Sequence, residues 1–385
     1  MIRRFGLAAV LVAVLAAIGL AGCSHPEARP DAGGWNRIAA TAYLDRRAAW
    51  WIAWPGAARD RQTVCLSCHT TLPYALARSA LRGRPDEPSS NERAIFASVV
   101  ARVRHWAEVN PYYHDRQGDP YKSSESRATE AVLNALVLVD RDMKTGRLSA
   151  DAKTALEHMW RLQQTSGDRA GSWPWLQFDL RPWEAADSPY FGAALAALAV
   201  GEAPDDYRST PEIRDQVARL REYLDREYAR QPLSNRVVLL WAAARWPELV
   251  EAERRRALVA EILRAQQPDG GWSLASLAKP PGRASVRGLL RSWMHRDGSR
   301  AASDGCATGL ALIALLDAHT PASDAQIEHG LAWLAHSQSA DGDWRAASMN
   351  KVRDPASDIG RFMSDAATAY AVLALTRAGV SAQQD

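Results

Sequence analysis

The stretch GLAWLAHSQSADGDW, residues 330–344, combines a helical apolar period with a Gln and a Gly-x-Trp element that follow it. Two earlier stretches repeat this order: QQPDGGW at residues 266–272 and, with an insertion, QQTSGDRAGSW at residues 163–173. Self-similarity of this kind indicates a repeat architecture, in which each copy buries its apolar face against the next.

A second element follows each copy: an acidic residue that opens a helix of small and aliphatic residues. One more such helix lies ahead of the first copy. Small-residue helices approach their neighbours closely and suit an inner ring, whereas longer charged helices such as residues 211–230 suit an outer ring. The small-residue helices are expected at 125–136, 187–198, 304–315 and 365–375.

Helical spacing extends over nearly the whole chain from Trp35 onward, and no stretch alternates as a strand would. Pro and Gly fall mostly between the helical segments. The sequence therefore predicts an all-α fold, with helices near 36–53, 91–109, 125–140, 151–164, 189–200, 210–229, 234–246, 252–266, 305–318, 324–338 and 366–378.

The Gln/Trp corners resemble the QW repeats of terpenoid cyclases and protein prenyltransferase β subunits, which share an α/α toroid. The resemblance covers roughly residues 120–380 and implies toroid repeats over residues 121–385, after an N-terminal helical region at 35–120. A Trp at each corner is a large apolar plate whose indole N–H can be satisfied locally. This explains much of an unusual composition, fifteen Trp against five Phe.

The activities of those families are less well matched. The Asp-x-Asp-Asp acid of squalene-hopene-type cyclases is absent. Asp304-Gly-Cys306 matches part of the prenyltransferase zinc site, but Thr368 stands where the resemblance requires a His, so zinc is not expected. Cys306 is then a small buried apolar residue. The recurring acids are interpreted as helix N-caps or first-turn charges, with a ring of catalytic acids as the alternative: Glu125, Asp187, Asp304 and Asp365.

The stretch VCLSCHTTLPY, residues 64–74, places Cys65, Cys68 and His69 in a C-x-x-C-H pattern. A zinc half-site needs a second pair of ligands, which the remaining cysteines do not supply. A thioredoxin-type dithiol needs a surrounding α/β pattern, which is not visible. A disulfide between the two cysteines stays open as an alternative.

This pattern resembles the haem-attachment motif of c-type cytochromes. The resemblance implies that Cys65 and Cys68 bind haem c covalently and that His69 is the proximal iron ligand. The distal ligand is open, and a five-coordinate iron is equally consistent with the sequence. Candidates are His114, on a loop with aromatic neighbours, and also His105, Met143 and Met159.

The N-terminus indicates the compartment. A short basic head, an apolar run and the sequence Leu-Ala-Gly-Cys23 resemble a bacterial lipoprotein signal, which implies a signal peptide at 1–22, lipidation of Cys23 and a flexible tether at 23–34. The residue directly after Cys23 is Ser24 and not an Asp, which would suggest retention in the inner membrane. By resemblance to the sorting rule of such proteins, we expect an outer-membrane lipoprotein that faces the periplasm.

Charge and composition limit the partners. The net charge is +3, and the basic residues are spread among acidic ones, so nucleic acid is not expected. The leading hypothesis is a lipid-anchored electron-transfer protein whose haem is carried on the toroid, with a redox protein or a quinone-linked membrane component as partner. The alternatives are a toroid that binds or modifies a terpenoid or other apolar lipid, and a non-enzymatic interaction scaffold.

Overall fold

The computed structural model describes residues 34–82, 87–204, 206–278, 302–321 and 323–382. Residues Gly34–Asp385 form one compact unit, and helices make up most of it. Among the described residues, the only sheet is an antiparallel hairpin of two short strands, β1 (Ala58–Arg59) and β2 (Thr63–Val64). The prediction of an all-α fold is confirmed.

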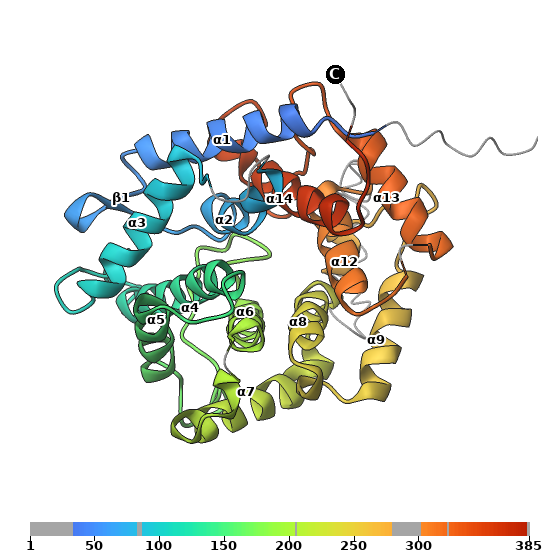
Figure 1. Ribbon diagram of the computed structural model, residues 1–385. Coiled ribbons are helices and arrows are strands. Elements are labelled where there is room, and N and C mark those ends of the chain that lie inside the picture. The colour runs from blue at the N-terminus through green and yellow to red at the C-terminus, as the bar shows by residue number, and fades with distance from the viewer. Residues whose placement is uncertain (1–33, 83–86, 205, 279–301, 322, 383–385) are drawn as a thin grey trace, which may run out of the picture. The chain divides into compact units, whose positions relative to one another are not determined.

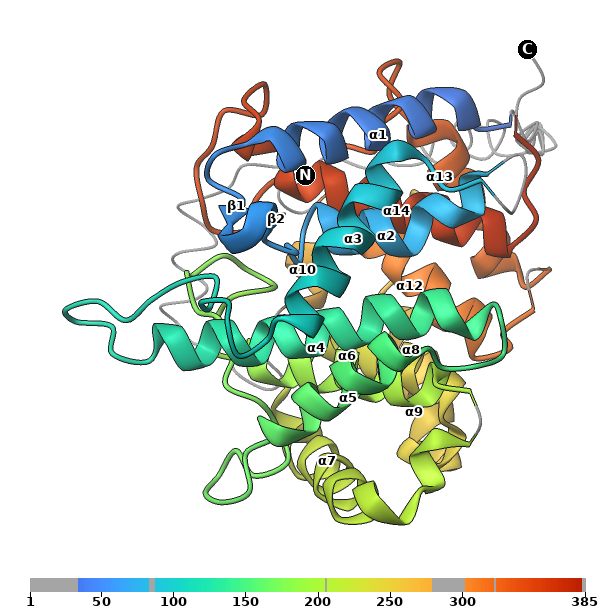
Figure 2. The same ribbon diagram turned by 60° about the vertical axis from the view of Figure 1, so that its left-hand side comes forward.

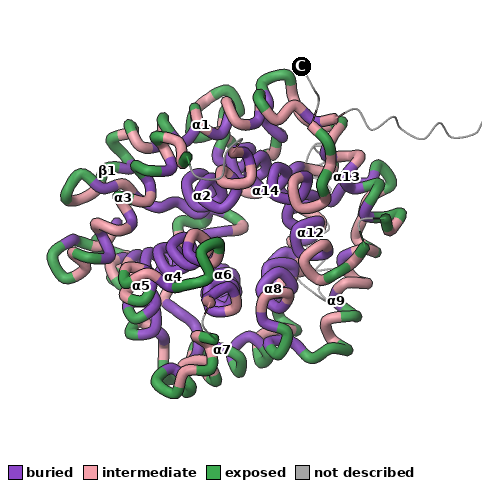
Figure 3. The backbone as a smooth tube through the Cα atoms, in the orientation of Figure 1, coloured by how far each residue is buried: buried purple, intermediate pink, exposed green. Residues whose placement is uncertain are grey.

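Six helices of this unit pack side by side in a closed series, and Figure 1 shows them around a common centre. Each packs against the next, and the last packs against the first: α2 (Thr71–Arg78), α4 (Lys122–Met143), α6 (Ser188–Glu202), α8 (Leu233–Arg245), α12 (Gly305–Asp317) and α14 (Phe362–Arg377). Most of their residues are buried, as the colouring of Figure 3 shows. We call these the inner helices.

Small residues on the inner helices permit close packing. A Cβ atom on Gly309 of α12 would lie 2.6 Å from the backbone of Tyr370 on α14, and one on Gly192 of α6 would lie 2.2 Å from the Trp175 ring. Both contacts are too short for any residue with a side chain. The small residues from which inner helices were predicted are therefore needed for this close packing.

A second set of helices, the outer helices, covers the inner ones. Each contacts at least one inner helix, and Figure 2 shows α1 running across α2 and α14: α1 (Arg37–Ala53), α3 (Ser90–Arg104), α5 (Ala150–Arg161), α7 (Arg214–Glu227), α9 (Ala252–Arg264) and α13 (Ala325–Ser337). A short helix, α10 (Leu274–Leu277), packs between α8 and α12. The outer helices are amphipathic; α7, for example, buries only Leu220, Tyr223 and Leu224.

The three Gln/Trp corners are built alike. In each, the Gln amide donates to the carbonyl of the corner glycine and to a carbonyl at the start of the next outer helix: Gln163 to Gly171 and Gln216, Gln266 to Gly270 and Gln326, Gln338 to Gly342 and Asn36. Each corner tryptophan donates its indole N–H to a carbonyl of the preceding helix: Trp173 to Met159, Trp272 to Ile262, Trp344 to Leu334. The corner glycines have φ of 97°, 92° and 90°, which only glycine adopts readily.

Helices from residues 35–120, which the sequence sets apart as an N-terminal region, pack directly with those of residues 121–385. Helix α2 is itself an inner helix, between α14 and α4. No helix is predicted there from the sequence, because α2 has only eight residues and contains Pro73 in its first turn. This helix begins two residues after His69.

No helix among the described ranges is long and apolar enough to cross a bilayer. The expected signal peptide at 1–22 and the lipidation site Cys23 lie outside the described residues, as does nearly all of the tether at 23–34.

Candidate functional site

The segment from Cys65 to His69 connects β2 to α2 and is held from both sides by main-chain hydrogen bonds. The Cys65 amide donates to the Ala57 carbonyl at 2.8 Å, and the Trp51 indole donates to the Cys65 carbonyl at 2.7 Å. The Leu66 amide donates to the hydroxyl of Tyr112 at 3.2 Å. Cys65 and Leu66, at the start of the segment, are therefore held by α1 and by the residues that follow α1 and α3.

Ser67 caps the start of α2. Its hydroxyl accepts hydrogen bonds from the amides of Thr70 and Thr71, both at 3.1 Å, which satisfies two amides that have no partner inside the helix. The Ser67 amide in turn donates to the Thr71 hydroxyl at 2.9 Å. This reciprocal cap places His69 at a fixed point immediately before the helix.

Both thiols of the motif are buried and free. Cys65 is 5% exposed and Cys68 is 2% exposed, and neither is joined in a disulfide. Burial raises the pKa of the Cys65 thiol to about 12 and that of Cys68 well above its usual value. In the folded chain both groups are therefore neutral thiols, which are poor nucleophiles.

The imidazole of His69 lies among aromatic rings. Phe362 stacks on it with ring centroids 3.8 Å apart, Trp51 meets it nearly edge-on at 5.2 Å, and Trp183 lies at 5.8 Å. Burial lowers the pKa of His69 to about 3, with smaller contributions in the same direction from Arg353 and Arg47. The ring is therefore neutral at physiological pH, the form in which histidine binds metals.

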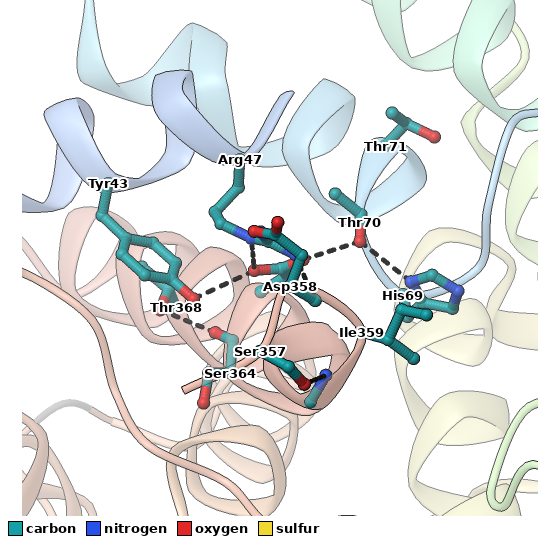
Figure 4. Close-up of polar contacts among 12 residues, drawn as sticks. Tyr43, Arg47, His69, Thr70, Thr71, Ser357, Asp358, Ile359, Ser364 and Thr368 are labelled. Carbon is teal, nitrogen blue, oxygen red and sulfur yellow. Dashed lines mark hydrogen bonds and ion pairs between the residues drawn. The ribbon is translucent and has the colours of Figure 1, made fainter. Parts of the chain in front are cut away.

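A hydrogen-bond chain fixes which nitrogen of His69 carries the proton (Figure 4). The Thr70 hydroxyl donates to Asp365 at 2.7 Å and lies 2.9 Å from His69 Nδ1. Because a hydroxyl has one hydrogen, Thr70 must accept the second bond, and His69 must be protonated on Nδ1. Nε2 then carries no proton, and its lone pair can bind a metal. This lone pair lies in the ring plane and not on the face that Phe362 covers.

Asp365, at the far end of this chain, is 1% exposed and accepts hydrogen bonds from three residues. Arg47 donates through Nε at 2.7 Å and Nη2 at 3.1 Å, the Tyr43 hydroxyl donates at 3.0 Å, and Thr70 donates as above. Burial raises the pKa of Asp365, and these donors oppose the rise. Because Asp365 accepts all of these hydrogen bonds, its ionised carboxylate form fits the site.

Glu184 is a further ionisable group near the motif. Burial raises its pKa to about 7, while Lys122 and Arg353 oppose this change. After burial, its negative charge is the largest contribution to the raised pKa of Cys68. No pattern in the sequence distinguishes this residue, because it lies in the irregular segment before α6.

The residues considered as distal ligands lie on separate elements. His114 is exposed on the loop before α4. His105 ends α3, with Nδ1 3.2 Å from Glu108, Met143 is the last residue of α4, and Met159 is buried in α5. The identity of a distal ligand remains a prediction.

The recurring acids occupy N-cap or first-turn positions, as interpreted. Asp304 caps α12 by accepting from the Ala307 amide at 2.9 Å, and Glu125 lies in the first turn of α4. Asp187 stands before α6 and Asp365 in the first turn of α14. Of these four acids, only Asp365 bonds to Thr70, the residue that follows the C-x-x-C-H motif, and the sequence does not predict that contact.

Thr368, at the position where the prenyltransferase resemblance would require a His, has a structural role. Its hydroxyl accepts from the Trp344 amide at 3.1 Å and donates to the Ser364 carbonyl at 2.7 Å. Thr308 makes the matching bond to the Trp272 amide at 2.8 Å. Within the described part of the chain, no three His, Cys, Asp or Glu side chains are grouped as metal ligands.

Comparison with known proteins gives no family for this chain. No family model and no curated protein matches the sequence. Among solved structures, a polysaccharide lyase is similar to it at a TM-score of 0.36 and 13% identity, over 90% of each chain. A likeness this distant does not bear on activity, so the function is argued from the site itself.

Proposed function

We propose that this chain is a c-type haem protein in which an α/α toroid of the inner and outer helices carries the cofactor. Cys65 and Cys68 would form the thioether links, and Nε2 of His69 would bind the iron. The observation that carries the proposal is the hydrogen-bond chain from His69 through Thr70 to Asp365, because it leaves Nε2 unprotonated on the residue that directly follows the second of two free thiols. These residues fit the donor set that covalent haem requires.

Bound haem would supply a one-electron redox centre. The surrounding residues serve to hold the iron ligand: Phe362 and Trp51 limit rotation of the imidazole, and Thr70 holds the proton on Nδ1. The carboxylate of Asp365 polarises this hydrogen bond and makes the imidazole a stronger electron donor, as outer partners of metal-bound histidines do. The role that fits such a centre is electron transfer.

The cellular setting follows from the N-terminal sequence. We propose that Cys23 carries lipid and holds the protein on the periplasmic face of the outer membrane, near a redox protein or a quinone-linked partner. The variant Cys23→Ala should then move the protein from the membrane fraction to the soluble periplasmic fraction. An unchanged distribution would contradict the lipid anchor without bearing on the haem.

The deciding experiment is a pyridine haemochrome spectrum of the chain produced with a haem-maturation system. The wild-type protein should retain a Soret-absorbing group after denaturing electrophoresis, and the Cys65→Ala, Cys68→Ala double variant should not. Cys306→Ala is the matched control, because Cys306 is also a buried free thiol but lies outside the motif. A colourless wild-type protein would refute the proposal, and co-purified lipid would then favour the lipid-binding alternative.

A further inference from the structure

A pocket of about 610 Å³ opens beside the candidate haem site. Its walls come from α1, from the segment between α13 and α14, and from the N-terminal ends of α12 and α14. Tyr43, whose hydroxyl bonds to Asp365, forms part of the wall. None of the roles proposed above for the motif uses this pocket.

Two of the three carboxylates in the pocket wall are occupied by donors of the protein itself. Asp304 accepts from the Ala307 amide at 2.9 Å and from the Leu274 amide at 2.6 Å. Asp343, buried, accepts from the Ser339 hydroxyl. Asp341 is exposed and is the remaining carboxylate of the wall.

The three arginines of the same wall are differently placed. The side chains of Arg345 and Arg361 make no hydrogen bond or ion pair to any residue in the described ranges. That of Arg46 makes one hydrogen bond there, to the Asp341 carbonyl at 3.4 Å, and lies over the Tyr43 ring. The wall thus holds equal numbers of carboxylates and guanidiniums, and the arginines differ from the carboxylates in that most of their donors have no acceptor among the described residues. All three arginines are exposed, so their donors are open to a ligand from solution. Guanidinium groups offer several donors in a plane, which matches carboxylate and phosphate oxygens.

The pocket is connected to His69 through the wall that Tyr43 forms. The Tyr43 hydroxyl donates to Asp365 Oδ1 at 3.0 Å, and Oδ2 of the same carboxylate accepts from Thr70, the partner of His69 Nδ1. Figure 4 shows this series from Tyr43 to His69. An anion near Tyr43 would change the field at Asp365 and so the strength of the bond to the imidazole.

We propose that this pocket binds a small oxyanion, a carboxylate- or phosphate-bearing molecule, through Arg46, Arg345 and Arg361, and that its occupancy is sensed at His69. Binding itself does not depend on haem, whereas the sensing step rests on the proposed function. The two parts are therefore tested separately.

The binding test is isothermal titration of the full chain with inorganic phosphate and with succinate, each at low ionic strength, and with glycerol as a neutral probe. Phosphate, succinate or both should bind, and the double variant Arg345→Gln, Arg361→Gln should weaken binding at least about tenfold. The control is Arg256→Gln, Arg264→Gln, which removes the same charge from exposed positions on α9. No binding of either anion, or equal loss in both double variants, overturns the proposal.

The sensing test uses the haem-loaded chain and follows the Soret band as the bound anion reaches saturation. Wild type should show a shift that Tyr43→Phe abolishes, while anion affinity in Tyr43→Phe stays within about twofold of wild type. An identical shift in both proteins, or no shift in wild type, overturns the sensing step. If no haem is attached at all, the proposed function fails while the titration result stands.

Discussion

Thr70 and Asp365 lie 295 positions apart in the chain, yet the Thr70 hydroxyl donates a 2.7 Å hydrogen bond to the Asp365 carboxylate. This bond joins the C-x-x-C-H motif to the last inner helix, α14, and determines the protonation of His69.

Asp365→Asn should destabilise the fold strongly. The change leaves the buried Arg47 guanidinium without its only buried charge partner among the described residues, a loss that typically costs about 3–5 kcal/mol. Asp358→Asn is the matched control, because Asp358 binds the same arginine but is 52% exposed and should cost only about 0–1 kcal/mol. Urea unfolding of both variants measures the difference, and equal stabilities would contradict the role given to Asp365.

Thr70→Val should release the proton of His69 from Nδ1. Loss of the hydroxyl leaves a buried N–H without an acceptor, at a cost of about 1–3 kcal/mol. Nitrogen NMR of the imidazole distinguishes the two tautomers, and Thr70→Ser should restore the wild-type spectrum. Retention of the Nδ1–H form in the valine variant would show that Thr70 does not set the tautomer.

Stability should fall as pH rises from about 4.5 to about 8, in part because of Glu202. Burial, and then the charge of Asp140, raise the pKa of Glu202 from 4.5 to about 8, so in this window the folded state holds a proton that the unfolded state has lost. One such group contributes a slope of at most about 1.4 kcal/mol per pH unit.

Glu202→Gln should flatten this decline and make the protein more stable than wild type at pH 9. The side chain of Glu202 is 2% exposed, whereas Glu222 on α7 is exposed, so Glu222→Gln should leave the pH profile as in wild type. Urea midpoints measured across the range give both curves. If the pH curve of Glu202→Gln ran parallel to that of wild type, a group other than Glu202 would be responsible for the decline.

Gln338→Ala should weaken the junction between α13 and α1. Gln338 accepts from the Asn36 amide at 2.7 Å and donates to the Asn36 and Gly342 carbonyls, and the loss of these bonds should cost about 1–3 kcal/mol. Gln216→Ala is the control, since the Gln216 side chain makes no hydrogen bond to the described residues. Comparable losses in thermal stability for both variants would show that the Gln338 hydrogen bonds do not stabilise the junction between α13 and α1.

Cys65 and Cys68 should react slowly with iodoacetamide in the folded apoprotein. Both thiols are buried, and a pKa of about 12 for Cys65 implies alkylation at least about a hundredfold slower than in urea. Mass spectrometry of timed samples measures the two rates. Fast alkylation of the native protein would mean that the motif is open to reagents in solution.

The repeating parts of the fold could be predicted from the sequence because each corner depends on residues close together in the chain. The Gln, Gly and Trp of residues 338–344 form their bonds within one turn and one loop, so the spacing alone reveals them. Helix α2 could not be predicted this way, since eight residues are too few for a helical period to stand out in the sequence and Pro73 lies in its first turn.

The motif at Cys65, Cys68 and His69 is also a local pattern that the sequence reveals. The residues that surround it in the fold cannot be recognised in the same way. Arg47 and Asp365 are 318 positions apart and become partners only when the inner helices close. A Thr after a His, or an Arg in a helix, is too common to single out. The sequence thus indicates which residues would hold a cofactor and leaves out those that orient them.

Because Thr70 and Asp365 are far apart in the chain, they are synthesised at different times. Synthesis of the chain begins at its N-terminus, so residues 65–69 are made long before those of α14. Until that last helix arrives, His69 lacks its anchor and the two thiols lack part of their cover. Covalent modification of the cysteines would thus belong to the interval of biogenesis, and completion of the ring would end it.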